Sequence, residues 1–462
     1  MTFSNIDQLN LGNLLQIVFS NGVRNQISQD YRDWEYVSRY RVGNSAAREL
    51  RFMFQTNYGP AAIQYRNPGQ TGGRAFPAAQ QSTIQENTAK FKEINATIEL
   101  EYNMWDRARK SPEKYGEPLA LEIQAKTTAA KRRIAADLYG DGTGVIGELG
   151  ASSAAFNANG TVTFTLADTN SARGTVGFFE FGDLLYLRAA AGTATAFDTN
   201  LATEPDHWKV VSKDRTTRQV TLRGRDSAGA DLNVTGITTQ PTAGEVFYRY
   251  GQPTIPNLTT IGSSDYGTLT EVIAGLDSLT AADGRTIHDI TMEGATAGTR
   301  VDAGGNPLDV TYIQQALDKV KVAVGQDSYS WKMMSMSPEA HSTLVESRET
   351  DRRFQTVQDT KRGISFFAYV HGNDTVETYT SEYVPQQKMY MLPEAKSSDK
   401  VLEYWGSDFE TVKANGMGDF HLKPASGGGH ENTIVSYLSS IGVIVCKHPA
   451  SIAVVENFKV AS

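Results

Sequence analysis

The residues of this chain that could bind a metal ion or transfer protons are scattered histidines and a few neighbouring carboxylates. The seven histidines are His207, His288, His341, His371, His421, His430 and His448. No two of them have the H-E-x-x-H spacing or another spacing typical of metal ligands. Glu99 and Glu101 share one face of a strand pattern and predict a solvated surface. Asp137 and Asp141 lack the regular ligand ladder of a calcium loop. We therefore expect no catalytic residue, no metal and no cofactor.

A glycine motif that resembles a nucleotide-binding loop follows the strongest helical pattern in the chain. Gly142, Gly144 and Gly147 match G-x-G-x-x-G. That motif binds a dinucleotide where it follows a strand and begins a helix, whereas here it follows a helix. The sequence has neither a Walker loop nor a G-x-S-x-G nucleophile elbow. The three glycines therefore predict a tight exit from the helix.

The charge balance limits the ways in which this chain could bind nucleic acid. The formal net charge is −8 over 462 residues, and a protein that grips phosphates needs clustered Lys and Arg. A nucleic-acid reader is therefore not expected, whereas a wall that merely faces nucleic acid is compatible with this charge. One positive segment, Arg215–Arg225, lies near Asp206-His-Trp208. Together they predict a binding face or a solvated turn, and the turn is favoured.

Cysteine content and hydropathy predict the compartment. Cys446 is the single cysteine, so intramolecular disulfides and cysteine zinc sites are excluded. Residues 1–8 contain no Lys or Arg and do not resemble a secretion signal. The longest apolar run, Ile434–Cys446, is too short to span a bilayer. These features predict a soluble intracellular product, and the length predicts two to four domains.

The segment Ile94–Tyr139 changes its hydrophobic period once. Ile94–Met104 alternates apolar and polar residues, as a strand with one buried face does. Leu119–Tyr139 then has apolar residues three or four apart, which predicts a long helix that ends at Gly140. A long strand followed by a long helix needs packing partners from the rest of the chain.

An arm that projects from the body is predicted before this helix. A second strand, Leu50–Thr56, is separated from the strand at Ile94 by Tyr58–Thr88, which is rich in Gly, Pro, Gln and Asn. Two long strands that flank such a tip favour a projecting arm, and an isolated pair of strands is marginal in water. The arm should therefore lie on another molecule. The N-terminal apolar stripe Leu11–Val23 is expected to pack on its own core, in preference to a neighbouring subunit.

The remaining chain divides into a β-rich segment and a mixed one. Residues 157–251 read as short strands and predict a small inserted barrel or sandwich. From residue 254 helices and strands alternate, and residues 348–363 are expected to form a charged surface loop. The predicted helices are Thr268–Thr280, Asp309–Val324 and one that begins at Ser337-Pro338-Glu339. The predicted later strands are Trp331–Met336, Ile364–Tyr369, Thr375–Tyr379, Lys388–Leu392, Val401–Trp405 and Thr433–Cys446.

The order of these elements resembles the major capsid proteins of tailed bacteriophages, whose Hong Kong 97-type fold is shared by encapsulins. The matching segments are Leu11–Val23 (N-arm), Leu50–Met104 (extended β loop), Leu119–Tyr139 with its Leu-Tyr-Gly-Asp-Gly-Thr-Gly144 exit (spine helix), Asp309–Ser347 (axial domain), and Ile441–Ala450 with Val454-Val-Glu-Asn457 (C-terminal strand). The resemblance rests on their order, since none of them is catalytic or diagnostic alone.

The resemblance implies an α+β fold of the Hong Kong 97 type with an inserted all-β domain. The implied parts are an N-terminal arm (1–48), an extended β loop (49–104), a peripheral domain with the spine helix (105–156), the inserted barrel or sandwich (157–251), a mainly axial domain (252–398), and peripheral strands with a C-terminal return (399–462).

The implied function is a structural one. Copies of the chain would form hexamers and pentamers of an icosahedral head that encloses double-stranded DNA without sequence-specific binding, so the chain is not expected to be an enzyme. The implied partners are further copies, a scaffolding protein, a portal and, in some heads, decoration proteins, with no membrane. The implied location is the virion, after assembly in the host bacterial cytoplasm. The side chains expected at contacts between subunits are Leu14, Val18, Trp34, Phe52, Phe54, Arg66, Arg74, Phe76, Arg352 and Arg353.

Two departures from the family pattern modify these expectations. Some family members cross-link their shells through a lysine on the extended loop, but the tip Gln64–Gln81 contains no lysine, so no covalent cross-linking is expected. No charged helical prefix precedes the N-terminal stripe, so a separate scaffolding protein is expected. The alternatives are an encapsulin-like compartment, a β-rich tail or adhesin component, and an enzyme with an unrecognised site.

Overall fold

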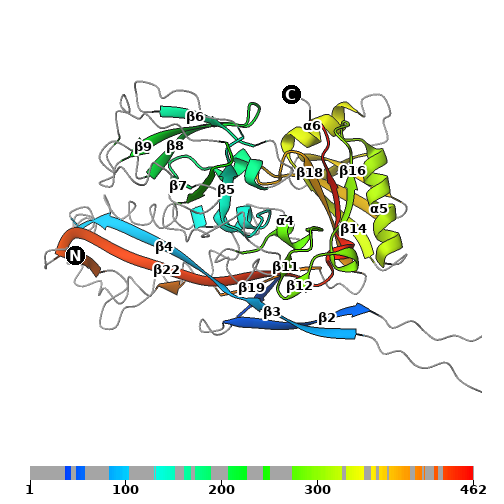
Figure 1. Ribbon diagram of the computed structural model, residues 1–462, viewed down its shortest axis with the longest axis horizontal. Coiled ribbons are helices and arrows are strands. Elements are labelled where there is room, and N and C mark those ends of the chain that lie inside the picture. Colours follow the sequence, from blue (N-terminus) through cyan, green and yellow to red (C-terminus); the bar gives the residue numbers. More distant parts are fainter. Residues whose placement is uncertain are drawn as a thin grey trace, which may run out of the picture.

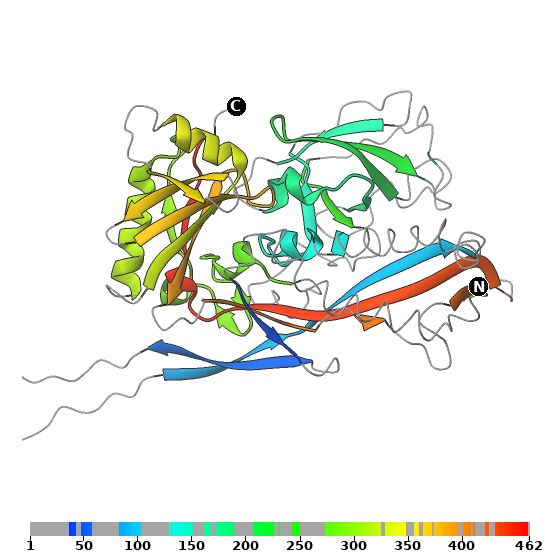
Figure 2. The same ribbon diagram turned by 180° about the vertical axis from the view of Figure 1, so that it is seen from behind.

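The structure is a computed structural model of the chain. It describes residues 37–42, 48–57, 83–102, 129–130, 132–150, 161–167, 172–188, 207–225, 231, 243–249, 273–324, 329–347, 355–359, 364–371, 374–395, 401–407, 410–411, 421–424 and 430–460. The expected α+β class is confirmed: three large sheets form the body, and helices pack against them (Figures 1 and 2). The N-terminal stripe Leu11–Val23 lies outside the described residues.

A seven-stranded mixed sheet forms one half of the body (Figure 1). Its strands lie in the order β13 (Thr299–Asp302), β23 (Ala453–Glu456), β18 (Lys388–Ala395), β14 (Tyr329–Met336), β17 (Asp374–Thr380), β16 (Ile364–His371) and β15 (Gln355–Asp359). Both faces of its central strands are buried, because Met389 and Met391 of β18 face one core whereas Tyr390 between them faces the other. Helices α5 (Val310–Val324) and α6 (Pro338–Glu346) cover the Met389 side.

These two helices begin where the sequence predicts. The Asp309 carboxylate accepts a hydrogen bond from the amide of Val310 at 2.7 Å at the start of α5. The Ser337 hydroxyl accepts one from the amide of Ala340 at 3.1 Å and so caps α6. The buried residues of α5 are spaced three or four apart, as in an amphipathic helix: Ile313, Ala316, Leu317 and Val320.

A six-stranded antiparallel sheet in the other half of the body curls into a small barrel. Its strands lie in the order β5 (Val145–Glu148), β10 (Val246–Arg249), β7 (Leu184–Arg188), β8 (His207–Asp214), β9 (Gln219–Arg225) and β6 (Thr161–Thr165). A bridge between Leu149 and Leu166 joins the two edges. Aromatic rings meet edge to face inside the barrel: Phe164, Trp208, Phe179 and Phe247. The strands expected within 157–251 are confirmed, and β5 joins them from before that segment.

The long strand β22 (His430–Cys446) organises the third sheet. One edge of β22 pairs with β4 (Lys92–Glu101), from Thr433 opposite Glu101 to Gly442 opposite Lys92. The other edge pairs with the short strands β21 (His421–Pro424), β20 (Glu410–Thr411) and β19 (Leu402–Gly406). Strand β1 (Ser38–Arg41) pairs in parallel with the other edge of β19.

Two expectations about regular structure are wrong. Within the expected helix at 268–280, the structure describes residues from 273 onward, and α4 (Leu276–Leu279) is its sole helical part there. Gly275 is extended, and the amide of Leu276 donates to the carbonyl of Leu138 at 2.7 Å. The expected loop at 348–363 contains a strand, because Gln355–Asp359 pairs with β16 and closes the edge of the seven-stranded sheet.

We expect Gly275→Ala to destabilise the fold by about 3 kcal/mol. A β-carbon at this position would lie 2.2 Å from the carbonyl oxygen of Asp137 and 2.7 Å from that of Leu138. Both are backbone atoms at the end of the helix that contains residues 132–137, so they cannot rotate away. Chemical denaturation measures the effect. Gly284→Ala is the comparison variant. Alanine adopts the φ of 78° at Gly284 less readily than glycine does, but its β-carbon would meet no atom within 4 Å. If Gly275→Ala proved the milder of the two, close packing would not be the constraint at Gly275.

Candidate assembly interface

The hairpin of β2 (Glu49–Asn57) and β3 (Thr83–Lys90) is the candidate assembly element. These strands pair with each other and with no further strand of the described chain. The hairpin runs below the body in Figure 1 and leads into residues beyond the described ones. The expectation that the strand at Leu50 pairs with the one at Ile94 is wrong, because Ile94 belongs to β4 and pairs with β22. The sequence pattern missed β3 because Ile84 is its single large apolar residue.

The base of the hairpin packs on the sheet organised by β22. Ala89 of β3 is buried against Val443 and Val445 of β22. Leu50 and Phe52 of β2 pack around the same cluster, and Phe52 also contacts the main core. Phe52, expected at a contact between subunits, therefore packs at least partly on its own chain.

The opposite face of the hairpin exposes apolar side chains to solvent. Met53 is 79% exposed and Ile84 is 61% exposed. Because Met53 lies opposite Glu86 and Ile84 lies two residues before Glu86, both side chains share this outer face. An ion pair between Arg51 and Glu86, at 3.5 Å, lies beside them in solvent. A two-stranded hairpin is marginal alone, so this outer face is a candidate contact surface.

A tight turn between β11 (Thr286–Ile287) and β12 (Ile290–Thr291) lies next to the base of the hairpin (Figure 1). Its two central residues, His288 and Asp289, have left-handed φ angles of 53° and 63°. Such turns favour Asn and Gly, because a β-carbon is disfavoured in this conformation. The strain implies that the contacts of these side chains hold the turn.

Both side chains of this turn bond to neighbouring strands. The Nε2 of His288 donates to the carbonyl oxygen of Ile444 on β22 at 3.0 Å. The Asp289 carboxylate accepts a hydrogen bond from the amide of Thr88 on β3 at 3.2 Å. Burial lowers the pKa of His288 to about 4, so its imidazole is neutral at pH 7. The turn therefore links the hairpin to the body.

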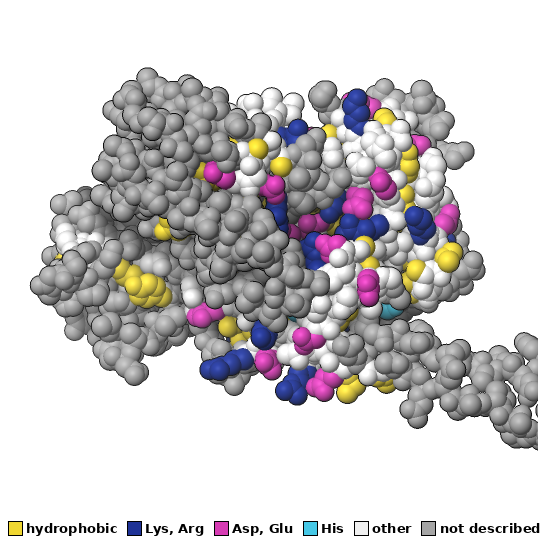
Figure 3. Space-filling view, viewed as in Figure 1, with side chains coloured by type: hydrophobic (Ala, Val, Ile, Leu, Met, Phe, Trp, Pro, Cys, Tyr) yellow, Lys and Arg dark blue, Asp and Glu magenta, His cyan; other side chains and the backbone are white. Residues whose placement is uncertain are grey.

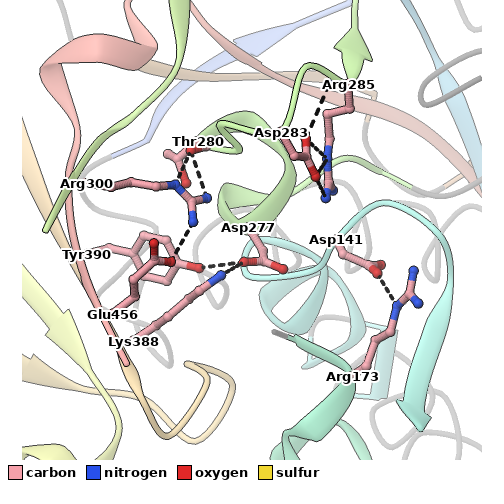
Figure 4. Close-up of polar contacts among 10 residues, drawn as sticks. All are labelled: Asp141, Arg173, Asp277, Thr280, Asp283, Arg285, Arg300, Lys388, Tyr390 and Glu456. Carbon is pink, nitrogen blue, oxygen red and sulfur yellow. Dashed lines mark hydrogen bonds and ion pairs between the residues drawn. The ribbon is translucent and has the colours of Figure 1, made fainter. Parts of the chain in front are cut away.

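A buried ion pair joins α4 to the seven-stranded sheet in the centre of the molecule (Figure 4). The Nζ of Lys388 on β18 contacts the carboxylate of Asp277, and both side chains are almost fully buried. The hydroxyl of Tyr390 donates to the same carboxylate at 3.3 Å. Burial, the largest single influence, raises the pKa of Asp277, but the charge and hydrogen bond of Lys388 together with the charges of Arg285 and Arg300 outweigh it, so that pKa is lowered. Burial, followed by the charge of Asp277, raises the pKa of Tyr390 well above its usual value.

A second ion pair continues this polar cluster (Figure 4). Arg300 of β13 donates twice to the carbonyl oxygen of Thr280, at 3.1 and 3.0 Å. Its third contact is the Glu456 carboxylate of β23 at 2.5 Å. Through these contacts the cluster positions α4 on the sheet.

The glycine motif is the tight helix exit that the sequence predicts. Gly142 and Gly144 have left-handed φ angles of 75° and 79°, and the chain continues into β5. The carboxylate of Asp141 accepts hydrogen bonds from the amide and the hydroxyl of Thr143 at 2.9 and 2.5 Å. The Nε of Arg173 also donates to it at 2.8 Å. The Asp141 carboxylate thus holds the turn that leads from the helix into β5.

Arginines of the segment 215–225 form ion pairs with acidic side chains, as follows. Arg223 and Arg225 both pair with Asp231 at 2.9 Å. Arg215, in the turn after β8, donates to both carboxylate oxygens of Glu339 in the first turn of α6, at 2.9 and 3.0 Å. Trp208 lies inside the barrel. These three arginines therefore have acidic partners within the chain, and Arg215 fastens the barrel to α6.

Within the part of the chain that the structure describes, no three His, Cys, Asp or Glu side chains lie close enough together to hold a metal ion. His207 is buried in the barrel, and His288 is buried in its turn. No helix in the described ranges is long and apolar enough to cross a membrane. In Figure 3, acidic and basic side chains are interspersed on the visible described surface.

Most side chains expected at subunit contacts lie outside the described residues. Those residues are Leu14, Val18, Trp34, Arg66, Arg74, Phe76, Arg352 and Arg353. Phe54 lies on β2, and its backbone pairs with Gln85. Met53 and Ile84 were not singled out in the sequence, although strand alternation places Met53 on the face opposite Phe52. The alternation Arg51-Phe52-Met53 was the signal that could have found it.

Comparisons with known proteins gave similarity at the level of solved structures alone. No family model matches the chain, and no curated protein matches it. A cyanophage A-1(L) capsid is 11% identical, with 92% of each chain covered and a TM-score of 0.45. The capsid of a native GTA particle is 9% identical, with 93% of this chain and 89% of the other covered, at a TM-score of 0.37. An encapsulin complex from Synechococcus elongatus is 19% identical, with 36% of this chain and 54% of the other covered, at a TM-score of 0.24. Capsid structures are thus among those to which the chain is similar, in agreement with the resemblance in its sequence; at these TM-scores no function follows from the similarity.

Proposed function

We propose that the chain is a structural subunit of a phage head that assembles with further copies of itself into a closed shell. The observation that carries this proposal is the β2–β3 hairpin. Its inner face packs on the body at the base, while its outer face exposes Met53 and Ile84. A strand pair of this kind gains stability by lying on a second molecule. Copies of the same chain supply that molecule in a symmetric shell.

The finer features of this proposal follow the family resemblance. The chain has a Hong Kong 97-type fold, with the N-terminal arm at 1–48, the extended loop at 49–104 and the inserted barrel at 157–251. The peripheral domain occupies 105–156 and 399–462, and the mainly axial domain 252–398. Hexamers and pentamers enclose double-stranded DNA, with a scaffolding protein and a portal as partners and decoration proteins in some heads. The paired barrel arginines and the net charge of −8 support enclosure of DNA without a strong grip on it.

Expression of the chain with its scaffolding protein tests the proposal. Light scattering and electron microscopy should show closed particles of many copies of the 50.5 kDa chain. The contents of particles from infected cells distinguish two kinds of shell: packaged DNA supports the phage head, whereas a protein cargo supports an encapsulin-like compartment. A stable monomer at all accessible concentrations would contradict both.

A further inference from the structure

The β11–β12 turn fills a place that strand pairing leaves open. The pairing of β4 with β22 ends at Lys92 opposite Gly442. Beyond this point the chain leaves β22 through Phe91 and enters β3, which pairs with β2 instead. The carbonyl oxygen of Ile444, two residues further along β22, accepts the Nε2 hydrogen of His288. The imidazole therefore occupies the edge of β22 where β3 diverges from it.

The same turn also bonds to β3. Asp289 accepts the amide hydrogen of Thr88, so two adjacent side chains of one turn bond to the two strands that diverge. The neighbouring Asn87 is fully buried, and neither its amide oxygen nor its amide nitrogen has a hydrogen-bond partner. A buried amide without partners is unfavourable, and it would regain hydrogen bonds to water if β3 moved away. The packed position of β3 therefore depends on its other contacts, this turn among them.

Protonation of His288 would oppose the packed position. A protonated imidazole still donates from Nε2, so the bond to Ile444 is not what is lost. The cost is that of a buried positive charge, which Lys92 of β4 also repels. Asp289 attracts this charge, but the attraction is smaller than the burial penalty. When the turn opens, the imidazole is solvated and regains an ordinary affinity for protons. Acid therefore favours the open turn.

We propose that the β11–β12 turn is an acid-released clasp, which fixes the base of the β2–β3 hairpin to β22 and frees it when His288 is protonated. The geometry of the clasp belongs to the single chain. Its consequence, that mild acid loosens the hold of one subunit on the next, rests on the proposed function.

The size of the effect follows from the proton linkage. The pKa of His288 is about 4 in the closed turn, against an ordinary value of 6.5. The open turn therefore binds more protons than the closed one between these two values, and opening increases as the pH falls through this window. The opening equilibrium should increase by roughly 300-fold from well above pH 6.5 to well below pH 4, and by several tens-fold between about pH 6.5 and about pH 4.5.

Hydrogen exchange of the unassembled full-length chain tests the clasp. Amide protection of residues 83–90 and 286–291, corrected for the intrinsic pH dependence of exchange, should fall several tens-fold between about pH 6.5 and about pH 4.5. At about pH 4.5 residues 83–90 and 286–291 should be less protected than α5, because a local opening is more populated than global unfolding. Equal protection of α5 and of these residues at that pH would overturn the proposal, because both would then exchange through global unfolding, and constant protection in β3 would overturn it directly.

Two variants assign the effect to one side chain. His288→Asn keeps a residue that tolerates the left-handed conformation and removes the titrating ring, so protection of β3 should no longer depend on pH in this range. Asp289→Asn keeps an oxygen that accepts from Thr88 and removes the carboxylate, so the pH dependence should persist. A pH dependence that survives in His288→Asn, or that vanishes in Asp289→Asn, would overturn the assignment to His288. Failure of the proposed function would instead appear as an absence of shells at neutral pH, which this exchange experiment does not measure.

Discussion

Lys388→Met lowers the free energy of unfolding by about 3–5 kcal/mol. The variant keeps the length and much of the volume of the side chain but removes the charge that faces Asp277. Both groups are almost fully buried, and Tyr390 donates to the same carboxylate. In the wild-type chain the charge and hydrogen bond of Lys388, with the charges of Arg285 and Arg300, together outweigh burial and keep the pKa of Asp277 below its usual value. Without that charge, burial leaves a carboxylate that is costly to ionise.

The pH dependence of this variant follows from the same balance. In the wild-type chain the depressed pKa of Asp277 contributes stability that is present above the pKa of the unfolded chain and is lost as the pH falls through the folded value. In Lys388→Met the pKa of Asp277 moves upward instead. The difference in free energy of unfolding between this variant and the wild type should therefore shrink towards acid pH. Urea denaturation at several pH values measures both effects.

Two controls define what a failure of this prediction would mean. The double variant Lys388→Met with Asp277→Leu removes both charges and should recover much of the loss, since an apolar pair of similar volume replaces the ion pair. Arg51→Met breaks an ion pair whose side chains are 68% and 58% exposed, and it should cost less than about 1 kcal/mol. A loss in Lys388→Met no larger than that of Arg51→Met would show that burial does not set the strength of the Lys388–Asp277 pair.

The second large effect is expected on assembly. Met53→Glu together with Ile84→Glu should prevent shells from forming at concentrations at which the wild-type chain assembles. Both side chains lie on the exposed outer face of the hairpin. Their burial against a neighbour would require two carboxylates to leave water, which is unfavourable without paired cations. Both positions are exposed in the single chain, so repulsion from Glu86 is the main cost, and its free energy of unfolding should fall by no more than about 1 kcal/mol.

A matched variant separates apolar contact from simple sequence change. Met53→Leu with Ile84→Val keeps the outer face apolar, and its assembly should resemble that of the wild type. Particle yield from sedimentation, measured alongside the denaturation of the unassembled chain, distinguishes the two pairs. Normal shells from the glutamate pair would place the subunit contact elsewhere on the chain.

Local patterns predicted those elements whose stability depends on neighbouring residues in the sequence. Helix α5 follows from apolar spacing, and α6 follows from the Ser337 cap. The strands of the barrel follow from alternation and turn residues, because a half-buried strand shows its period directly. The helix exit at Gly142 and Gly144 was also predictable from the sequence. The G-x-G-x-x-G motif there follows a helical pattern, whereas a dinucleotide-binding loop follows a strand.

The parts that sequence could not give depend on distant partners. Strand β3 carries few apolar residues, and its pairing with β2 is decided by the packing of Ala89 on Val443. The expected helix at 268–280 gives way to extended backbone at Gly275, which the end of another helix contacts closely. His288 and Asp289 have no local sequence signal for bonding to two strands. A pattern within one segment contains no information about which other segment will accept its hydrogen bonds.

The way in which β4 connects the hairpin to the body has a mechanical consequence. Tension on the hairpin passes through Phe91 to the end of β4 and is directed along that strand. The pairing of β4 with β22, from Lys92 to Glu101, is then loaded in shear, so that the hydrogen bonds along its length resist together. A strand pulled from its side would instead lose its bonds one after another. The longest of the described strands, β22, thus carries a lengthwise load through its pairing with β4.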